Sequence, residues 1–335
     1  MGVPQIRYTH TSDGKRIAYS VGGAGPTVVW LPSFLGAAKF PGLSELRQRY
    51  RVATYDSRGQ GLSTRGLAPD HTMQEWETDL DAVIDAIGGD RAALIGACHS
   101  SHVALRYAVR HPERVSALIL VSSCVRLAEW GPESFWLGLA HEDWDFFLTQ
   151  LVPRSVPYDQ VGRAVEWMKD SITADEYRVF QDVVTPSDIE QDAPRVTVPA
   201  LVVHPRNFDQ LRPEHSAELA SLIPGSEFAF VPGGERGIWG DLSKLVEMVD
   251  EFLTSRVAGH AGLHVPVSAA MPENLTRREV EILRLIACGR SNGEIAEELT
   301  LSVRTVERHI TNVYRKIESR GRAEATAFAL RSGIA

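Results

Sequence analysis

Cysteine is scarce in this 335-residue chain, which has only Cys98, Cys124 and Cys288. Three cysteines so far apart cannot form a disulfide framework, and no C-x-x-C pair indicates a zinc site, so we expect no metal and no cofactor. No apolar run approaches the roughly 20 residues that a membrane span needs, and no charged-then-apolar leader opens the chain. These absences favour a cytoplasmic protein with no membrane partner.

An overall excess of positive charge is also lacking, since the net charge is -8. Residues 273–335 nevertheless hold 11 Arg/Lys and 9 Asp/Glu, a balance of +2, which leaves -10 for residues 1–272. The basic excess therefore lies at the end of the chain, where a nucleic acid could bind. The length fits two domains, one large and one small.

Short β-branched runs alternate with helical segments over the first 257 residues. This alternation is typical of an α/β fold, a mostly parallel sheet covered on both faces. In such sheets ligands bind at the carboxyl ends of the strands, so functional residues should directly follow the runs. Strands are predicted at 27–31, 51–55, 92–95, 117–121, 200–203 and 227–231.

The segment from Asp56 to Ser63 reads Asp-Ser-Arg-Gly-Gln-Gly-Leu-Ser and matches the Asp-x-Arg-Gly-x-Gly-x-Ser turn of the α/β-hydrolase family. The chain resembles that family over residues 5–257. We expect the glycines to permit a tight backbone and an Asp/Arg pair to brace the loop. The resemblance implies an α/β-hydrolase fold with a helical cap at about 126–192.

That family presents its nucleophile in a Gly-x-Ser-x-Gly turn between a strand and a helix. Here the turn runs from Gly96 to Ser100, with Cys98 at the nucleophile position. Taking Ser100 as the nucleophile would instead put Cys98 and His102 at positions that need glycine. A thiol at a helix N-terminus should have a lowered pKa, so Cys98 is the candidate nucleophile.

The other members of a catalytic triad are incomplete. Asp209 corresponds to the family acid, but the segment 230–239, where the family histidine should lie, contains none. Arg236 or Glu235 occupies its position, and arginine stays protonated and cannot act as a general base. The sequence therefore indicates an impaired catalytic site rather than an enzyme.

Two histidines beside the elbow, His99 and His102, leave an alternative open. Either they pack locally, or one of them serves as the base for Cys98. The cap is dense in aromatic residues, which either pack it onto the core or line a roomy apolar pocket. For a pocket, with Arg236 as an anchor for a carboxylate or phenolate, the predicted ligand contacts are Phe34, Cys98, His99, Trp130, Trp136, Trp144 and Arg236.

The last sixty residues carry a different pattern. Helices are predicted from Thr276 to about Cys288, from Asn292 to Leu299 and from Ser302 onward, with Thr276, Asn292 and Ser302 as N-caps. The third has apolar residues at alternating spacings of three and four, a buried stripe opposite a polar, net-basic face. That stripe comprises Val303, Val306, Ile310, Val313 and Ile317.

From Leu275 to Ala335 the chain is similar throughout to the LuxR-type helix-turn-helix, including Arg290-Ser291-Asn292 and Thr305-Val306. The resemblance implies that the third helix enters the DNA major groove and that a fourth helix, 322–331, forms a homodimer contact. Glu307 stands where many relatives carry a neutral or basic residue, and it could accept from a cytosine amino group. The predicted DNA contacts are Glu307, Arg308 and Thr311 near bases and Thr305, Asn312 and Arg315 nearer phosphates. Arg304 and Lys316 are expected on the same exposed face.

These patterns predict an α/β-hydrolase-like domain at 1–257, a linker at 258–270 and an all-α DNA-binding domain at 271–335. We expect a transcription regulator, in this family more often an activator acting with RNA polymerase, that binds a double-stranded operator and senses a small hydrophobic effector. One alternative is a bifunctional regulator with Cys98-dependent ester or lactone hydrolysis. Another is a redox sensor at Cys98, which the lack of an evident resolving cysteine disfavours.

Overall fold

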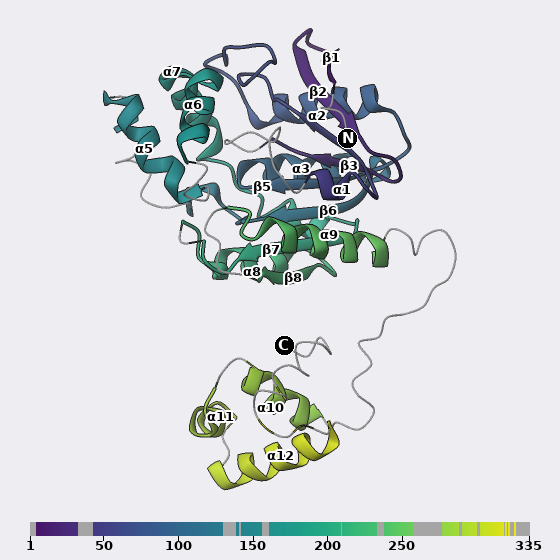
Figure 1. Ribbon diagram of the computed structural model, residues 1–335, viewed down its shortest axis with the longest axis vertical. Helices are drawn as coiled ribbons and strands as arrows, with labels where there is room; N and C mark the ends of the chain where they lie inside the picture. The colour runs from purple at the N-terminus through teal and green to yellow at the C-terminus, as the bar shows by residue number, and fades with distance from the viewer. Residues whose placement is uncertain are drawn as a thin grey trace. The chain divides into compact units, whose positions relative to one another are not determined.

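A computed structural model describes residues 5–32, 43–129, 139–140, 142–155, 161–208, 210–232, 238–256, 277–287, 290–299, 302–317, 319, 321 and 325. The chain divides into two compact units, Met1–Gly262 and Leu263–Ala335, and each is considered by itself (Figure 1). Among the described residues, no helix is long and apolar enough to cross a membrane.

The first unit is built on an eight-stranded sheet with the strand order β1-β2-β4-β3-β5-β6-β7-β8. Strands β3 to β8 are parallel, whereas β1 pairs antiparallel with β2, and β2 with β4. All six predicted strands are present, and β1 and β2 are additional. The strands are β1 Ile6–His10, β2 Arg16–Gly22, β3 Thr27–Trp30, β4 Arg51–Tyr55, β5 Ala92–Ala97, β6 Val115–Val121, β7 Ala200–Pro205 and β8 Glu227–Val231.

Helices cover both faces of this sheet, and alternate residues of each buried strand point to opposite faces. Val29 of β3 packs in a cluster with α2 (Met73–Ile87), α3 (His99–Arg110) and α8 (Pro213–Leu222). Its neighbours Val28 and Trp30 pack with α1 (Leu43–Leu46) and α9 (Leu242–Arg256). The result is the three-layer α/β arrangement that the sequence predicts.

Three helices within the predicted cap lie between β6 and β7 in the chain: α5 (Trp144–Ser155), α6 (Val161–Ser171) and α7 (Ala174–Val184). They group together beside the sheet (Figure 1). Helix α7 begins with a capping box in which Thr173 and Glu176 satisfy each other's backbone N–H groups. Short 3-10 turns occupy Pro112–Arg114, Leu127–Glu129 and Ala193–Arg195.

The turn from Asp56 to Ser63 has the tight backbone that its glycines predict, with φ of +82° at Gly59 and +50° at Gly61. A Cβ atom on Gly61 would lie 2.3 Å from Asp56 Oδ2, so that position needs glycine. The predicted bracing pair within the loop is wrong. Arg58 does not pair with Asp56, because it reaches out of the loop to other carboxylates. Asp56 instead accepts from the Leu62 N–H at 3.0 Å.

Those carboxylates are distant in sequence. The Arg58 Nε atom lies 2.8 Å from Asp79 Oδ1 on α2, and its Nη1 and Nη2 atoms lie 2.6 and 2.9 Å from the carboxylate of Asp13. Asp79 also accepts from the Arg58 backbone N–H at 2.9 Å. Arg58 therefore ties the loop after β4 to α2 and to the β1–β2 turn.

The second unit contains α10 (Arg277–Ala287), α11 (Asn292–Glu298) and α12 (Val303–Lys316). Ser302 caps α12 as predicted, its hydroxyl accepting from the Thr305 N–H at 3.2 Å. The predicted cap of α11 is wrong by one residue. Ser291, rather than Asn292, accepts from the Glu294 N–H and donates its own N–H to Glu294 Oε2 at 2.7 Å, a capping box. Thr276 and most of the predicted fourth helix lie outside the described residues.

A small apolar core joins these three helices. Val306, Ile310 and Val313 of α12 are buried as the predicted stripe requires, but Val303, the first residue of the helix, is 45% exposed. Buried with the α12 residues are Ile282, Leu283, Ile286, Ile295, Ala296 and Ala325.

One ion pair joins the start of α10 to the end of α12. Glu279, in the first turn of α10, is 4% exposed and its Oε2 atom lies 2.7 Å from the Lys316 Nζ atom. Lys316 was predicted on the exposed face of α12. The structure turns it toward α10 instead, because Glu279 is a buried carboxylate that needs a partner.

Candidate functional site

The turn between β5 and α3 holds Cys98 in a backbone conformation that is rare for a residue with a side chain. Its φ is +52° and its ψ is -125°, a strained combination that proteins keep mainly at functional turns. Gly96 makes the turn possible. A Cβ atom there would lie 2.6 Å from the Ser100 carbonyl oxygen. Strand and helix thus meet as closely as in a nucleophile elbow, with Cys98 at its tip.

Ser100, at the position of the second glycine, lies within α3 rather than at the tip. Its hydroxyl donates to the Ala97 carbonyl oxygen at 2.9 Å and accepts from the Ala97 N–H at 3.0 Å. This local bonding accommodates a side chain where the family pattern has none. Of the two frames considered from sequence, the backbone adopts the one that presents Cys98.

The Cys98 thiol is less acidic than predicted. Burial raises its pKa well above the usual value, and the neighbouring Cys124 thiol raises it further, while the His99 backbone N–H lowers it. The prediction of a lowered pKa is wrong because desolvation of the thiolate outweighs the favourable helix N-terminus. Cys124 is a second cysteine near Cys98 that the sequence did not reveal. The high pKa of the Cys98 thiol nevertheless disfavours its oxidation through a thiolate.

His102 is fully buried, and both of its ring nitrogens are engaged. Nε2 lies 3.0 Å from the Cys124 carbonyl oxygen, and Nδ1 lies 2.9 Å from Ser187 Oγ. A carbonyl only accepts, so Nε2 carries the proton and Nδ1 accepts from the Ser187 hydroxyl. Burial lowers the pKa of His102 to about 3. Of the two alternatives for this residue, the geometry supports local packing.

His99 is 6% exposed and is held by aromatic rings. Its ring centroid lies 4.8 Å from that of Phe180 on α7 and 5.7 Å from that of Trp76 on α2. Burial lowers the pKa of His99 to about 3, and nearby His102 lowers it further. At neutral pH this imidazole is therefore uncharged, and it can offer one donor and one acceptor.

Further rings extend from His99 in two directions, and we call the set the aromatic row. The Trp76 ring meets the His71 ring edge to face, with centroids 4.7 Å apart, and its centroid lies 5.5 Å from that of Phe180. In the cap, Phe180 contacts Tyr177 at 6.2 Å, and Tyr177 contacts Trp144 at 5.4 Å. The row comprises His71, Trp76, His99, Phe180, Tyr177 and Trp144.

Of the predicted ligand contacts, the structure brings Cys98 and His99 together. Trp144 is separated from His99 by two rings of the aromatic row, Phe180 and Tyr177. Trp76 was not predicted, although it is the ring that connects α2 to the elbow. The sequence feature that could have identified Trp76 is its position in the first turn of an amphipathic helix that starts at the carboxyl edge of the sheet. Five predicted site residues lie outside the described part of the chain: Phe34, Trp130, Trp136, Asp209 and Arg236.

Behind the elbow, hydroxyl and imidazole groups link the ends of β5, β6 and β7, and we call this the polar seam. Ser101 Oγ bonds both to the Cys98 carbonyl oxygen and to Ser123 Oγ. Ser216 Oγ donates to the Ser123 carbonyl oxygen at 2.6 Å and lies 3.0 Å from His204 Nδ1. The seam also includes the His102 and Ser187 pair described above.

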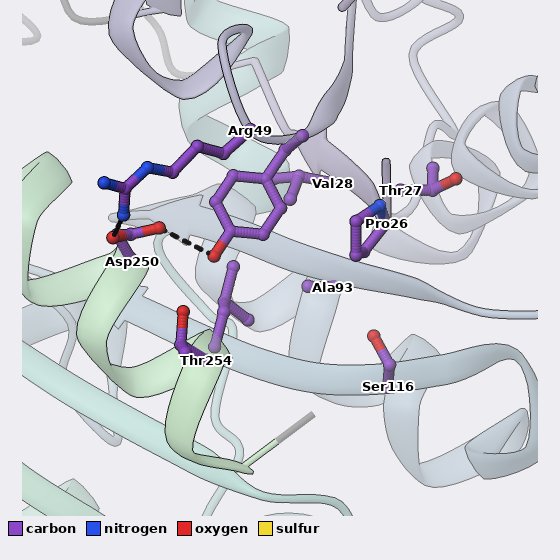
Figure 2. Close-up of a pocket in the computed structure, with 10 residues that line it drawn as sticks. Pro26, Thr27, Val28, Arg49, Ala93, Ser116, Asp250 and Thr254 are labelled. Carbon is purple, nitrogen blue, oxygen red and sulfur yellow. Dashed lines mark hydrogen bonds and ion pairs between the residues drawn. The ribbon is translucent and has the colours of Figure 1, made fainter. Parts of the chain in front are cut away.

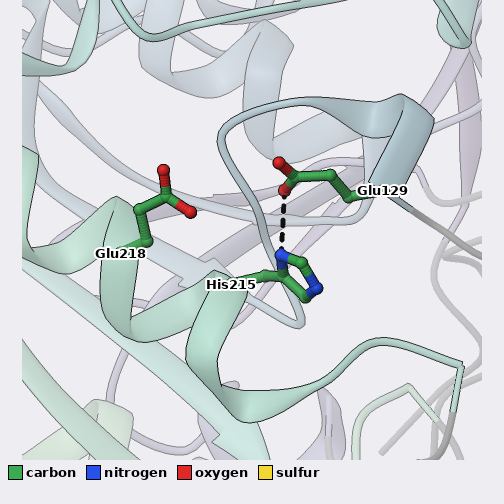
Figure 3. A group of neighbouring side chains, drawn as sticks. All are labelled: Glu129, His215 and Glu218. Carbon is green, nitrogen blue, oxygen red and sulfur yellow. Dashed lines mark ion pairs between the residues drawn. The ribbon is translucent and has the colours of Figure 1, made fainter.

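Three potential metal ligands gather elsewhere, at Glu129, His215 and Glu218 (Figure 3). His215 Nδ1 lies 3.1 Å from Glu129 Oε2, and Arg212 Nε donates to His215 Nε2 at 3.4 Å. Arg126 Nη1 lies 3.1 Å from Glu129 Oε1 and 3.6 Å from Glu218 Oε1. Because two arginines already supply positive charge, this arrangement is an ion-pair network rather than a vacant cation site.

In the second unit, the predicted DNA contacts share the outer face of α12, opposite its buried stripe. Thr311 Oγ1 donates to the Glu307 carbonyl oxygen at 2.9 Å, and Arg315 Nη2 donates to Asn312 Oδ1 at 3.2 Å. Thr305 Oγ1 lies 2.8 Å from Ser302 Oγ, at the start of the helix. The members of this face that are exposed are Arg304, Glu307, Arg308, Thr311 and Arg315, while Thr305 and Asn312 are half-buried.

Two separate parts of the chain match known protein families. Residues 26–152 match the family described as alpha/beta hydrolase fold. Residues 273–329 match the family described as bacterial regulatory proteins, luxR family. The two matched segments contain the elbow and α12, respectively.

Individual relatives follow the same division. LiaR, a transcriptional regulatory protein of Bacillus subtilis, is 45% identical over 85 residues, which is 24% of this chain and 40% of LiaR. The RutD protein of Caulobacter vibrioides is 37% identical over 106 residues, 31% of this chain and 39% of RutD. This chain thus spans about two fifths of each.

Longer matches concern the first unit. A pimeloyl-[acyl-carrier protein] methyl ester esterase of Nitrosomonas europaea is 29% identical over 229 residues, 63% of this chain and 88% of the esterase. The crystal structure of an enol-lactonase from Burkholderia xenovorans superposes with a TM-score of 0.64 at 21% identity, covering 74% of this chain and all of the lactonase. At that identity the superposition concerns the fold.

Proposed function

We propose that this chain, in which an α/β-hydrolase domain precedes a LuxR-type helix-turn-helix domain, is a transcription regulator that senses a small apolar effector. One observation carries the sensing half of the proposal. The elbow keeps its strained geometry at Cys98, yet burial raises the pKa of that thiol and His102 has no ring nitrogen to spare for it. A hydrolase needs the opposite combination, an activated nucleophile with a base beside it.

The aromatic row supports an apolar effector held near the elbow. Phe180 and Trp76 enclose His99, whose lowered pKa keeps it neutral. Aromatic side chains of this kind suit a ligand with an aromatic or aliphatic body and one or two polar groups. The predicted contacts Phe34, Trp130, Trp136, Trp144 and Arg236 belong to the same proposal. An effector that favours one state of the protein by ~1 to 3 kcal/mol is enough for a useful response.

The outer face of α12 supports operator recognition in the major groove. We assign Glu307, Arg308 and Thr311 to base edges and Thr305, Asn312 and Arg315 to phosphates. A homodimer on a two-fold operator and an activating contact with RNA polymerase complete the proposal. The domain limits of 1–257 and 271–335, joined by a linker at 258–270, belong to it as well.

Binding to DNA selected by the protein from a random pool tests that assignment. Arg308→Ala should weaken binding by about 1 to 3 kcal/mol and relax selection at one base pair. Arg315→Ala should weaken binding to all sequences and reduce the salt dependence. Arg178→Ala, on the exposed surface of the cap, is the control. Equal binding by all three variants would refute the assignment.

A Cys98-dependent ester or lactone hydrolase is the second candidate, favoured by one observation. The strained φ of Cys98 and the His99 backbone N–H beside its thiol preserve the nucleophile and one oxyanion donor of a hydrolase. The esterase relative matches over most of its own length.

One experiment separates the two candidates. Purified protein is incubated with a panel of apolar esters, lactones and phenols, and its thermal unfolding is recorded together with the mass of each recovered compound. A compound that stabilises the native state and returns intact supports the sensor. A compound that returns hydrolysed by wild type and by Cys288→Ala, but not by Cys98→Ala, supports the enzyme and refutes the sensor as stated.

A further inference from the structure

A cavity of about 440 Å³ lies at the amino ends of β3, β5 and β6, where the last turn of α9 completes its wall (Figure 2). Strand β5 connects this cavity to the elbow, because Ala93 lines the cavity and Cys98 follows the other end of the strand. Five residues at ~3.3 Å each separate the two places by roughly 16 Å. The cavity is therefore distinct from the elbow and the aromatic row.

Most of the cavity wall is apolar. Val28 and Ala93 contribute from the sheet, Pro26 from the turn before β3 and Leu253 from α9. The volume falls within the ~300 to 1,000 Å³ typical of small-molecule sites. A ligand of mainly apolar surface would gain free energy by leaving water for this wall.

The charged groups at the cavity compensate one another. Arg49 forms an ion pair with Asp250, and Tyr50 Oη donates to the other carboxylate oxygen of Asp250 at 2.9 Å. Figure 2 shows this group on one side of the cavity, with Thr254 beside it. Since Arg49 and Asp250 carry opposite charges, the wall offers no net charge to hold an anion or a cation.

On the other side of the cavity lies the hydroxyl group of Ser116 (Figure 2). Ser116 is half-buried at the start of β6. Within the described part of the chain, this hydroxyl has no hydrogen-bond partner in the protein. It can donate and accept, so it can bind a hydroxyl or carbonyl group on an otherwise apolar ligand.

We infer that this cavity is a second small-molecule site, which takes a neutral, mainly apolar molecule with a single hydrogen-bonding group, of the phenol or aromatic alcohol class. The apolar wall holds the body of the ligand, and Ser116 binds its polar group. The ligand also contacts Leu253 and Thr254 in the last turn of α9, which ends at Arg256. Binding stabilises that turn, so occupancy is registered at the carboxyl end of α9.

The test uses 4-fluorophenol as the probe and the full chain, titrated by fluorine NMR. Thr254→Trp puts an indole at the mouth of the cavity from an exposed position, and Ser255→Trp adds the same ring at the next exposed residue, which does not line the cavity. Blocking the mouth should weaken binding about ten-fold or more, equivalent to ~1.4 kcal/mol. The Ser255→Trp control should bind as wild type does. Equal binding by all three proteins refutes the site, as does equal loss in both variants.

A second measurement locates the bound probe, since 4-fluorophenol could also bind at the elbow. Amide hydrogen exchange of residues 253–256 should slow when the probe is added to wild type, and it should stay unchanged in Thr254→Trp. Ser116→Ala, which removes the hydroxyl, should weaken binding while leaving the thermal unfolding of the free protein near that of wild type. Unchanged exchange in wild type at saturating probe overturns the proposal. Because the elbow is untouched, this outcome leaves the proposed function standing.

Discussion

Replacing Gly96 by alanine should destabilise the first unit far more than a single methyl group normally would. The added Cβ would lie 2.6 Å from the Ser100 carbonyl oxygen and 2.8 Å from both Ser100 C and Ser101 Cα. Ordinary contacts of a Cβ atom begin at 3.4 Å. The first turn of α3 would therefore have to move away from β5 by most of an ångström.

Neither side of this contact can yield easily. Strand β5 lies between β3 and β6 in the sheet, and the obstructing atoms are helix backbone rather than the end of a flexible side chain. Overpacking of a rigid interior costs ~1 to 3 kcal/mol, and we expect a value at the upper end, about 3 kcal/mol. Against a typical stability of ~5 to 15 kcal/mol, this is a large fraction.

The assay is denaturant unfolding of the full chain, followed by tryptophan fluorescence. Gly162→Ala on α6 is the matched control, because no atom lies within 4 Å of the Cβ added there. That change should be neutral or stabilise by up to about 1 kcal/mol through helix propensity. A Gly96→Ala protein within ~0.5 kcal/mol of wild type would refute the close strand–helix contact and the elbow geometry built on it.

Three further predictions concern the ion pair of the second unit and the buried titratable groups. Lys316→Met removes the cation that pairs with the buried Glu279 carboxylate and should destabilise the helix-turn-helix by about 1 to 3 kcal/mol, whereas Arg304→Met on the exposed face should change its thermal unfolding little. Burial raises the pKa of Glu77 to about 7, so above pH ~4.3 the folded state binds a proton that the unfolded state has lost. The free energy of unfolding should therefore fall as pH rises toward 7, and this fall should vanish in Glu77→Gln. The pKa of His102 is lowered to about 3, so stability should be lost as pH falls below ~6.5, with a slope in His102→Gln that is shallower by up to about 1.4 kcal/mol per pH unit. A wild-type pH profile in either variant would contradict the corresponding assignment.

Much of the fold follows from local sequence patterns. The predicted limits of β4 and β8, Arg51–Tyr55 and Glu227–Val231, agree with the structure because apolar runs with clear ends mark buried strands. Strand β1 has no such run, since Ile6 and Tyr8 are about half exposed at the edge of the sheet. Its pairing with β2 depends on the sheet rather than on its own pattern.

The candidate site, like the fold, could be predicted from the sequence only in part. The spacing of the elbow motif was sufficient to prefer Cys98 over Ser100, because a tight turn needs glycine at fixed positions. The pKa of Cys98 was not predictable in the same way, since it depends on how much water the assembled fold excludes. Contacts between residues far apart in sequence, such as Arg58 with Asp79 or His102 with Ser187, left no local signal either.

The polar seam limits how the interior behind the elbow can be redesigned. Ser216 Oγ bonds both the Ser123 carbonyl oxygen and His204 Nδ1, so a substitution at Ser216 removes a hydrogen bond from two buried groups at once. Partners would have to be exchanged together for apolar residues of matching shape. A chimera that takes β6 from another protein of the same fold, without serines that match Ser101 and Ser216, would thus be expected to misfold. A chimera that transfers the whole seam should retain the alignment of all three strand ends.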